Sequence, residues 1–379
     1  MDRILSSYIL KDLPSKIVLV MGPRQCGKTT LAKQLYPSYD YFNYDSAKDR
    51  LALKELSWDR AKPLIIFDEL HKKKDWKRWL KGIYDTEGIP PEYLVTGSAK
   101  LNIHRKAGDS LAGRHFTYRL HPFDLKEIVA VSKKPDQNAL FEQLWNVSGF
   151  PEPFLKGDLT YYKRWRRTHL DIILRQDLID ITSVKDIKAI ETLVELLKQR
   201  IGSTVSYASL ARDLEYDQTT IKRWLNLLED LYIIFRVTPF SKKITRSLLK
   251  EPKFYFYDHT YAEENEGARL ENIVACALLK EIHFLEDTKG IKGSLHYLRT
   301  KDGKEIDFLV NLEKMPPILI EVKQSDTTPS KAFDHFSKYL SGQMIQLVKV
   351  CDREKTYPNN LAIRSLIPWL AKLDLLNNN

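Results

Sequence analysis

The stretch that decides the fold is Ile17-Val18-Leu19-Val20-Met21-Gly22-Pro23-Arg24-Gln25-Cys26-Gly27-Lys28-Thr29-Thr30. β-Favouring residues run into Gly-x-x-x-x-Gly-Lys-Thr, and an apolar-periodic segment follows, which predicts a strand, a loop framed by glycines and a helix. Gly22 and Gly27 let the backbone turn so that successive N–H groups face one anion. A helix starting near Lys28 adds the positive end of its dipole. The pattern is therefore that of a phosphate-binding loop.

Two side chains of this loop have specific expected roles. Lys28 can reach the β- and γ-phosphates of a nucleotide, and the Thr29 hydroxyl can ligate Mg²⁺. A glycine-containing turn between strand and helix is the plainer alternative, which the flanking pattern disfavours. The residues expected to bind the nucleotide are Gly22, Pro23, Arg24, Gln25, Cys26, Gly27, Lys28, Thr29 and Thr30.

A second apolar run, Pro63-Leu64-Ile65-Ile66-Phe67-Asp68-Glu69, ends in two acids. It suits a buried parallel strand, which we expect beside the phosphate-loop strand, with its acids at the ligand-binding edge of the sheet. There Asp68 can hold Mg²⁺, and Glu69 can act as the general base that polarises the attacking water. A small-molecule kinase has no need of such a glutamate. Alone, the run is equally consistent with a strand that ends in solvated acids.

Two later segments add weaker candidates. Tyr93-Leu94-Val95-Thr96-Gly97-Ser98 reads as a buried strand, and Thr96 or Ser98 can lie between the two acidic positions and sense the γ-phosphate; an ordinary strand-to-loop turn explains them equally well. Arg114 follows a glycine and is a candidate catalytic arginine, acting in cis or from a neighbouring subunit. A surface arginine is the alternative.

The order of these motifs resembles the AAA+-type P-loop ATPases of prokaryotes that carry a C-terminal domain of the PD-(D/E)XK nuclease superfamily. The resemblance spans nearly the whole chain. It implies binding and hydrolysis of ATP with Mg²⁺, and it implies no cellular role.

Composition sets broader limits. The chain has 379 residues, 43% of them hydrophobic, and a formal net charge of +10, which predicts two or three domains. A polyanionic partner, DNA above all, and an ordinary basic protein account for the charge equally well. Three scattered cysteines give neither a disulfide framework nor a zinc spacing. No apolar run approaches the ~18 residues of a membrane span, and no signal-peptide core is evident. We therefore expect a cytoplasmic protein without a membrane partner.

Residues 146–245 turn helical after Gly149-Phe150-Pro151. Ser206 and Asp217 are expected to cap two consecutive short helices, and the strand at 232–237 then completes a winged-helix pattern. The exposed start of the second helix suits a DNA groove. A lid or spacer between domains is the alternative, since only two of the four candidate residues are cationic. These nucleic-acid candidates are Gln218, Thr219, Lys222 and Arg223.

The C-terminal part alternates short strands with helices, and its charged residues repeat with a period of two. Glu321 and Lys323 share one face of their strand; if the strand at 305–310 is a neighbour, Asp307 joins them. Two carboxylates can hold Mg²⁺, and a lysine beside them can orient a water or steady developing charge. Glu271, near the start of a predicted helix, can complete the metal site. An amphipathic hairpin with exposed ion pairs is the plainer alternative.

This arrangement resembles the PD-(D/E)XK nuclease core, carried over as Glu271, Asp307, Glu321 and Lys323. We thus expect an α/β multidomain protein: a P-loop NTPase with a parallel sheet (1–145), a helical winged-helix domain (146–245) and a restriction-endonuclease-like α/β domain (246–379). The expected function is ATP hydrolysis coupled to action on DNA. The alternative is a nucleotide-controlled switch or scaffold with an inactive nuclease fold and a protein partner, or self-association.

Overall fold

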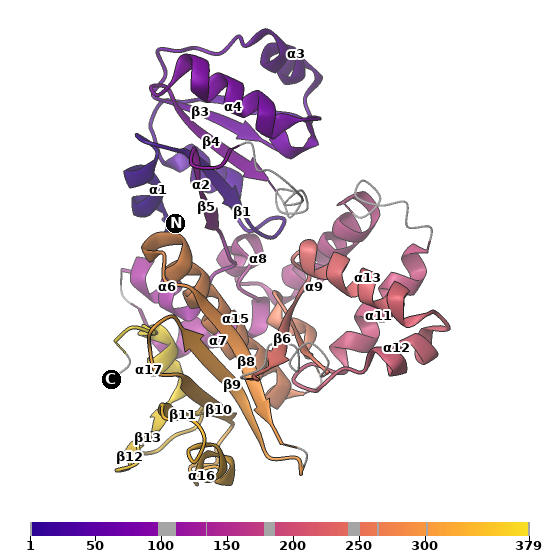
Figure 1. Ribbon diagram of the computed structural model, residues 1–379, viewed down its shortest axis with the longest axis vertical. Helices are drawn as coiled ribbons and strands as arrows, with labels where there is room; N and C mark the ends of the chain where they lie inside the picture. The colour runs from indigo at the N-terminus through magenta and orange to yellow at the C-terminus, as the bar shows by residue number, and fades with distance from the viewer. Residues whose placement is uncertain are drawn as a thin grey trace. The chain divides into compact units, whose positions relative to one another are not determined.

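The computed structural model describes residues 2–97, 111–133, 135–177, 186–241, 251–263, 265–300 and 302–377. The chain divides into two compact units, Met1–Pro122 with Asp230–Tyr232, and Phe123–Glu229 with Ile233–Asn379. Each unit contains its own sheet (Figure 1). None of the described helices combines the length and the apolar character that a membrane crossing requires.

The first unit is an α/β layer structure around one sheet. Its elements are α1 (Ser6–Asp12), β1 (Ile17–Met21), α2 (Lys28–Gln34), β2 (Asp40–Asn43), α3 (Ala47–Glu55), β3 (Leu64–Asp68), η1 (Leu70–Lys72), α4 (Trp76–Glu87), β4 (Glu92–Gly97) and β5 (His115–Arg119). All five strands are parallel, in the order β2-β3-β4-β1-β5. Every residue of β1 and of β3 is buried, as expected for inner strands of a parallel sheet covered on both faces.

The strand order corrects one expectation. The acidic strand β3 is not a neighbour of β1, because β4 lies between them and pairs with both. Hydrophobic runs show which strands are buried but not their order. On one face, rings pack around Phe67, with centroids 5.7 Å from Trp58 and 6.1 Å from Tyr93. This aromatic core fixes β3 against its neighbours.

The second unit joins a helical part to a mixed sheet. Its helices are α6 (Leu125–Val131), α7 (Gln137–Val147), α8 (Pro151–Lys156), α9 (Leu159–Ile172), the π-helical η2 (Ile173–Asp177), α11 (Ile187–Lys198), α12 (Tyr207–Leu214), α13 (Gln218–Asp230), η3 (His259–Tyr261), α15 (Glu266–Lys289), α16 (Lys331–Phe336) and α17 (Leu366–Ala371). Its strands are β6 (Ile234–Pro239), β7 (Lys253–Phe256), β8 (Gly293–Arg299), β9 (Glu305–Leu312), β10 (Ile318–Lys323), β11 (Gln343–Val348), β12 (Lys355–Thr356) and β13 (Leu361–Ser365).

The eight strands of this sheet follow the order β12-β13-β11-β10-β9-β8-β6-β7. The long helix α15 packs against β7, β8, β9 and β10 (Figure 1). Strands β6 and β7 pair antiparallel, and β6 also pairs with β8. The expected boundary at residue 245 therefore falls between two strands of one sheet, and the helical segment and the C-terminal segment form one compact unit.

Candidate functional site

The phosphate-binding loop lies between β1 and α2, as the sequence predicts. A Cβ atom added at Gly22 would lie 2.1 Å from the carbonyl oxygen of Leu120, so only glycine fits there. Gly27 caps α2 with a φ of +94°, in the left-handed region that favours glycine. The Lys28 ammonium donates to the carbonyl oxygens of Gly22 (3.0 Å) and Pro23 (2.6 Å). The loop thus curls around the end of its own lysine.

The Asp68 carboxylate, 6% exposed at the end of β3, gathers three hydroxyl groups. Thr29 and Tyr41 each donate to its Oδ2 across 2.8 Å, and Thr96 donates to its Oδ1. Mg²⁺ holds its ligands at about 2.1 Å in octahedral geometry, which places neighbouring oxygens about 3 Å apart. The hydroxyl of Thr29 and the carboxylate of Asp68 therefore fit two adjacent positions around Mg²⁺. In NTPase sites the substrate phosphates and water supply the other ligands.

Glu69 lies beside this pair in a strained backbone conformation, with a φ of +55°. Its N–H donates to the Thr96 carbonyl oxygen at 3.1 Å, which ties the end of β3 to β4. Its Oε2 lies 3.5 Å from His71 Nε2. Burial, together with the charge of Asp68, raises the pKa of the Glu69 carboxyl, while Lys28 opposes the shift. A carboxylate with a raised pKa is a better proton acceptor near neutral pH.

Two of the residues predicted to act on the nucleotide, Arg114 and Ser98, are not among the side chains described around Asp68. Arg114 precedes β5 and pairs with Asp85, with Nε and Oδ1 2.6 Å apart. Strand β5 is parallel to β1, and Ile17 is the register partner of His115. Arg114 therefore lies near the amino-terminal end of β1, whereas the phosphate loop follows the carboxyl-terminal end of β1. It therefore does not reach a nucleotide held by its own chain. Ser98 lies outside the described residues.

Sequence reasoning missed two residues of this site. The Tyr41 hydroxyl reaches Asp68 from β2, and burial together with the bond to Asp68 raises its pKa, so it stays a hydrogen-bond donor. Arg3, 6% exposed, donates from its guanidinium to the carbonyl oxygens of Cys26 (2.9 Å) and His121 (2.6 Å). Its location before the first helix gave no signal of this contact with the loop.

A second group of charged side chains lies in the other unit, where β9 and β10 pair antiparallel. Asp307 Oδ2 accepts from the Val322 N–H at 2.9 Å, and Lys323 Nζ lies 2.7 Å from Glu321 Oε1. The sheet thus brings Asp307, Glu321 and Lys323 together, as the period-two pattern predicts. Burial, reinforced by the charge of Asp307, raises the pKa of Glu321 to about 7.

Glu271 departs from the expected ligand set. Its Oε1 accepts from Lys253 Nζ (3.1 Å) and from the Tyr255 hydroxyl (2.5 Å), both on β7. Among the described residues, no group of three or more His, Cys, Asp or Glu side chains is arranged to hold a metal ion. The three predicted carboxylates are therefore not assembled as one ligand set among the described residues, and Glu271 pairs instead with the buried Lys253. Glu321 Oε2 is buried and has no hydrogen-bond partner among the described residues, and with Asp307 it offers the oxygen donors that Mg²⁺ prefers.

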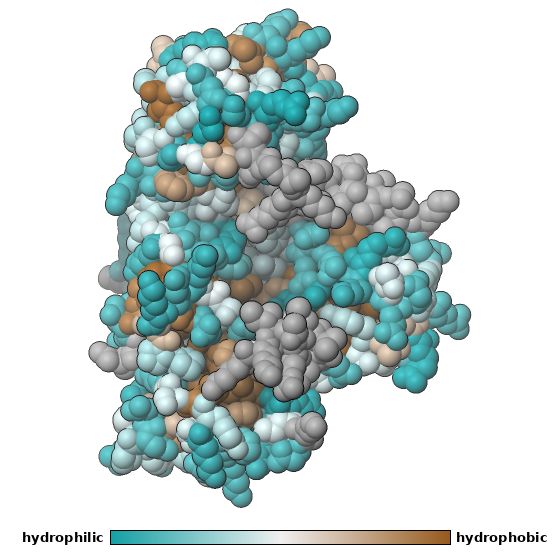
Figure 2. Space-filling model, viewed as in Figure 1, coloured by the Kyte–Doolittle hydropathy of each residue, from teal (hydrophilic) through white to brown (hydrophobic). Residues whose placement is uncertain are grey.

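Helix α13 presents the predicted nucleic-acid residues to solvent. Asp217 caps it by accepting from the Thr220 N–H at 2.8 Å, and Ile221, Trp224 and Leu225 are buried on its inner face. On the visible face of the molecule, hydrophilic residues predominate where α11–α13 lie (Figure 2). The exposed residues include all four candidates: Gln218, Thr219, Lys222 and Arg223.

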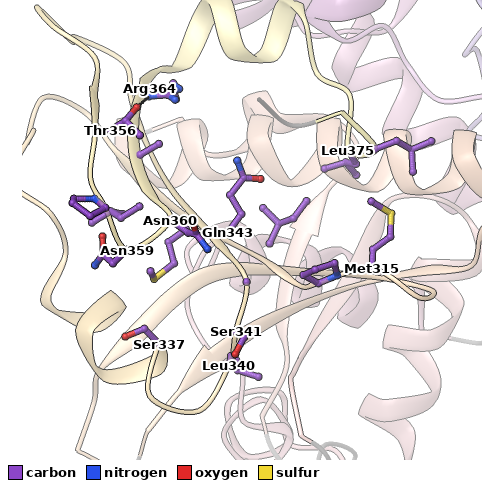
Figure 3. A pocket seen from close by; sticks show the side chains of 18 residues that line it. Met315, Ser337, Leu340, Ser341, Gln343, Thr356, Asn359, Asn360, Arg364 and Leu375 are labelled. Atoms are coloured by element: carbon purple, nitrogen blue, oxygen red, sulfur yellow. Dashed lines mark hydrogen bonds between the residues drawn. The ribbon is translucent and has the colours of Figure 1, made fainter.

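A cavity of about 900 Å³ lies away from the carboxylates, at the starts of β10, β11 and β13. Its walls include Met315, Gln343, Asn360, Arg364 and Leu375 (Figure 3). The described residues that line it include no Asp, Glu, His or Cys. Among the described residues, the cavity therefore offers neither carboxylate ligands nor an acid–base pair, whereas the predicted carboxylates lie toward the other end of β10.

The geometry of the phosphate loop agrees with comparisons to known proteins. Residues 14–129 match the family model described as "AAA domain". This part of the chain has an AAA-type P-loop fold. Residues 138–263 and 266–370 match two further models, each described as a domain of unknown function.

Relatives span most of the chain. An uncharacterized protein of Mycobacterium tuberculosis is 27% identical over 90% of this chain and 78% of its own length. An uncharacterized protein of Methanocaldococcus jannaschii is 25% identical over 87% of this chain and 80% of its own length. Among solved structures, the RuvB Holliday junction branch migration motor of Thermotoga maritima matches with a TM-score of 0.32 and 19% identity, over 65% of this chain and 91% of that chain.

Proposed function

We propose that the AAA domain binds ATP with Mg²⁺ and hydrolyses it. The observation that carries this proposal is the 2.8 Å hydrogen bond from Thr29 Oγ1 to Asp68 Oδ2, because it joins the phosphate loop to the acidic strand where a metal ion would bridge them. The bound Mg²⁺ would neutralise charge on the β- and γ-phosphates. Lys28 leaves its loop carbonyls to bind those phosphates.

In this proposal Glu69 is the general base. It accepts a proton from the water as the water oxygen bonds to the γ-phosphorus, and ADP leaves with the electron pair of the broken P–O bond. The Thr96 hydroxyl and the Tyr41 hydroxyl hold Asp68 in place. Arg114 can contribute to hydrolysis only from another subunit, since it lies near the amino-terminal end of β1 and the phosphate loop follows the other end.

Two substitutions test the assignment. Lys28→Ala should abolish ATP binding, measured by calorimetry with Mg²⁺ present. Glu69→Gln should keep binding but lower the turnover rate by about 10²–10⁴-fold, the typical contribution of a general base. Lys54→Ala and Glu55→Gln are matched controls, since both residues are exposed on α3. Wild-type turnover in Glu69→Gln would refute the role of Glu69, and no ATP uptake by the wild type would end the whole proposal.

A second candidate function concerns the other unit: metal-dependent cleavage of DNA by Asp307, Glu321 and Lys323. It is favoured by Glu321 Oε2, which lies beside a lysine and has no hydrogen-bond partner in the described part of the chain. The rival is a nucleotide-controlled switch that binds a protein or its own copy and cleaves nothing.

Incubating linear and plasmid DNA with Mg²⁺ or Mn²⁺ separates these two candidates. We expect cleavage by the wild type and by Asp302→Asn, an exposed acid in the β8–β9 turn, and none by Asp307→Asn. Cleavage that survives Asp307→Asn would exclude this site. No DNA binding even at low salt would favour the switch.

A further inference from the structure

Lys253 lies inside the carboxylate cluster of the second unit. Its side chain is 1% exposed, and its ammonium nitrogen lies 3.1 Å from Glu271 Oε1 and 2.6 Å from Glu305 Oε1. A buried ammonium persists only where carboxylates replace its lost hydration. Here Glu271 and Glu305 do so, each as an ion pair with the Lys253 ammonium. Lys253 is therefore a paired, buried cation of this cluster, at a position the expected nuclease pattern does not include.

Protein groups lie against both oxygens of the Glu271 carboxylate. Its Oε1 accepts from both Lys253 and Tyr255. Its Oε2 packs against the backbone of Gly202, where an added Cβ would lie only 2.8 Å away. Glu305 is the other partner of Lys253, and its Oε2 lies 3.4 Å from a guanidinium nitrogen of the exposed Arg299. Both carboxylates around Lys253 thus have their charge compensated by protein groups.

Asp307 and Glu321 are in a different situation. Glu321 is 5% exposed, and its Oε1 pairs with the partly exposed Lys323. Its Oε2 is buried, and no described residue forms a hydrogen bond with it. The register places Asp307 opposite Glu321, one step beyond the pair Ile320–Phe308. A buried acceptor beside a second carboxylate is the oxygen-rich, negatively charged setting that Mg²⁺ or Mn²⁺ requires.

We propose that Lys253 is a built-in cation that withdraws Glu271 and Glu305 from metal binding, so that the cluster takes one divalent ion, held by Asp307 and Glu321. The ammonium occupies the side of the cluster where a second ion would otherwise bind to Glu271. This inference takes the location of the site from the second candidate function. It depends neither on DNA cleavage nor on ATP hydrolysis.

The test is a nucleotide-free titration with Mn²⁺, with free Mn²⁺ followed by its paramagnetic resonance signal. The full-length chain carries Asp68→Asn so that the AAA domain contributes no metal site. We expect one Mn²⁺ per chain. Glu321→Gln should weaken its binding by more than about a hundredfold because a ligand is removed, whereas Glu271→Gln should change it by less than about tenfold. Equal losses in both variants, two bound ions, or binding that Glu321→Gln does not affect would each overturn the proposal.

A third variant addresses the lysine itself. In Lys253→Met the charge is removed while the length of the side chain is kept, and we expect a second Mn²⁺ that disappears when Glu271→Gln is added. An unchanged single ion in Lys253→Met would refute the role of Lys253. If Lys253→Met does not fold, because two buried carboxylates lose their partner, the contrast between Glu271→Gln and Glu321→Gln still decides which carboxylates bind the ion.

Discussion

At the scale of single residues, Arg3 is the strongest unanticipated feature of the AAA domain. Its guanidinium bridges the carbonyl oxygens of Cys26, within the phosphate loop, and His121, just beyond β5. A hydrogen bond from a charged donor contributes roughly 1.5–3 kcal/mol when its acceptor is buried. Arg3 does not lie among the residues expected to touch the nucleotide. Its role is to hold the loop in one shape, which makes it a positioning residue.

Arg3→Met should therefore weaken ATP binding by about tenfold, since roughly 1.4 kcal/mol of loop stabilisation is removed before the nucleotide binds. Arg3→Lys should recover only part of the affinity, because one ammonium does not bridge two carbonyls as a planar guanidinium does. Calorimetry gives the dissociation constants, and turnover at saturating ATP should fall less than the affinity. Arg50→Met is the matched control: Arg50 also donates to two carbonyl oxygens, of Tyr44 and Asp45, away from the loop. Equal effects in the two variants would show general destabilisation instead.

At the scale of elements, the sequence predicts what local pattern encodes. The strand–loop–helix around Gly27 and the acids that end β3 follow from hydrophobic runs and turn residues, and the caps Ser206 and Asp217 lie where expected. The position of β4 between β1 and β3 could not be predicted from the sequence, because each buried parallel strand shows a similar apolar run.

The burial of polar side chains by tertiary packing could not be predicted from the sequence either. Lys253 is the first residue of β7, and its burial follows from the pairing of β7 with β6 and from the contact with Glu271 of α15. Tyr41 lies on β2, and the pairing of β2 with β3 brings its hydroxyl to Asp68. Residue type and spacing thus pointed to Asp68, Asp307 and Glu321, whereas the pairing of Glu271 with Lys253 and the contact of Tyr41 with Asp68 depended on strand order and pairing.

Helix α13 carries a prediction of its own. If its exposed face binds DNA, Lys222→Ala with Arg223→Ala should weaken binding to all sequences alike and reduce the slope of log K against log[salt] by about 2, near 0.9 for each phosphate that is no longer neutralised. Fluorescence anisotropy over a salt series measures this. Lys331→Ala with Lys338→Ala removes the same charge from exposed positions around α16 and should leave the slope unchanged. A common slope in both double variants would assign the binding to overall charge and not to α13.

At the scale of the whole molecule, the decisive feature is that the phosphate loop and the C-terminal carboxylates belong to different compact units. A ligand stabilises the folded form of the unit that binds it, by about 2.7 kcal/mol at one hundred times its dissociation constant. We expect two transitions in calorimetric unfolding of Glu69→Gln, which binds ATP without consuming it. ATP with Mg²⁺ should raise only the transition of the AAA domain, by on the order of 10 °C for a unit of this size. Lys28→Ala should show no shift. If ATP moves both transitions together, or if only one transition exists, the units unfold cooperatively, and nucleotide binding is then energetically linked to the carboxylate cluster.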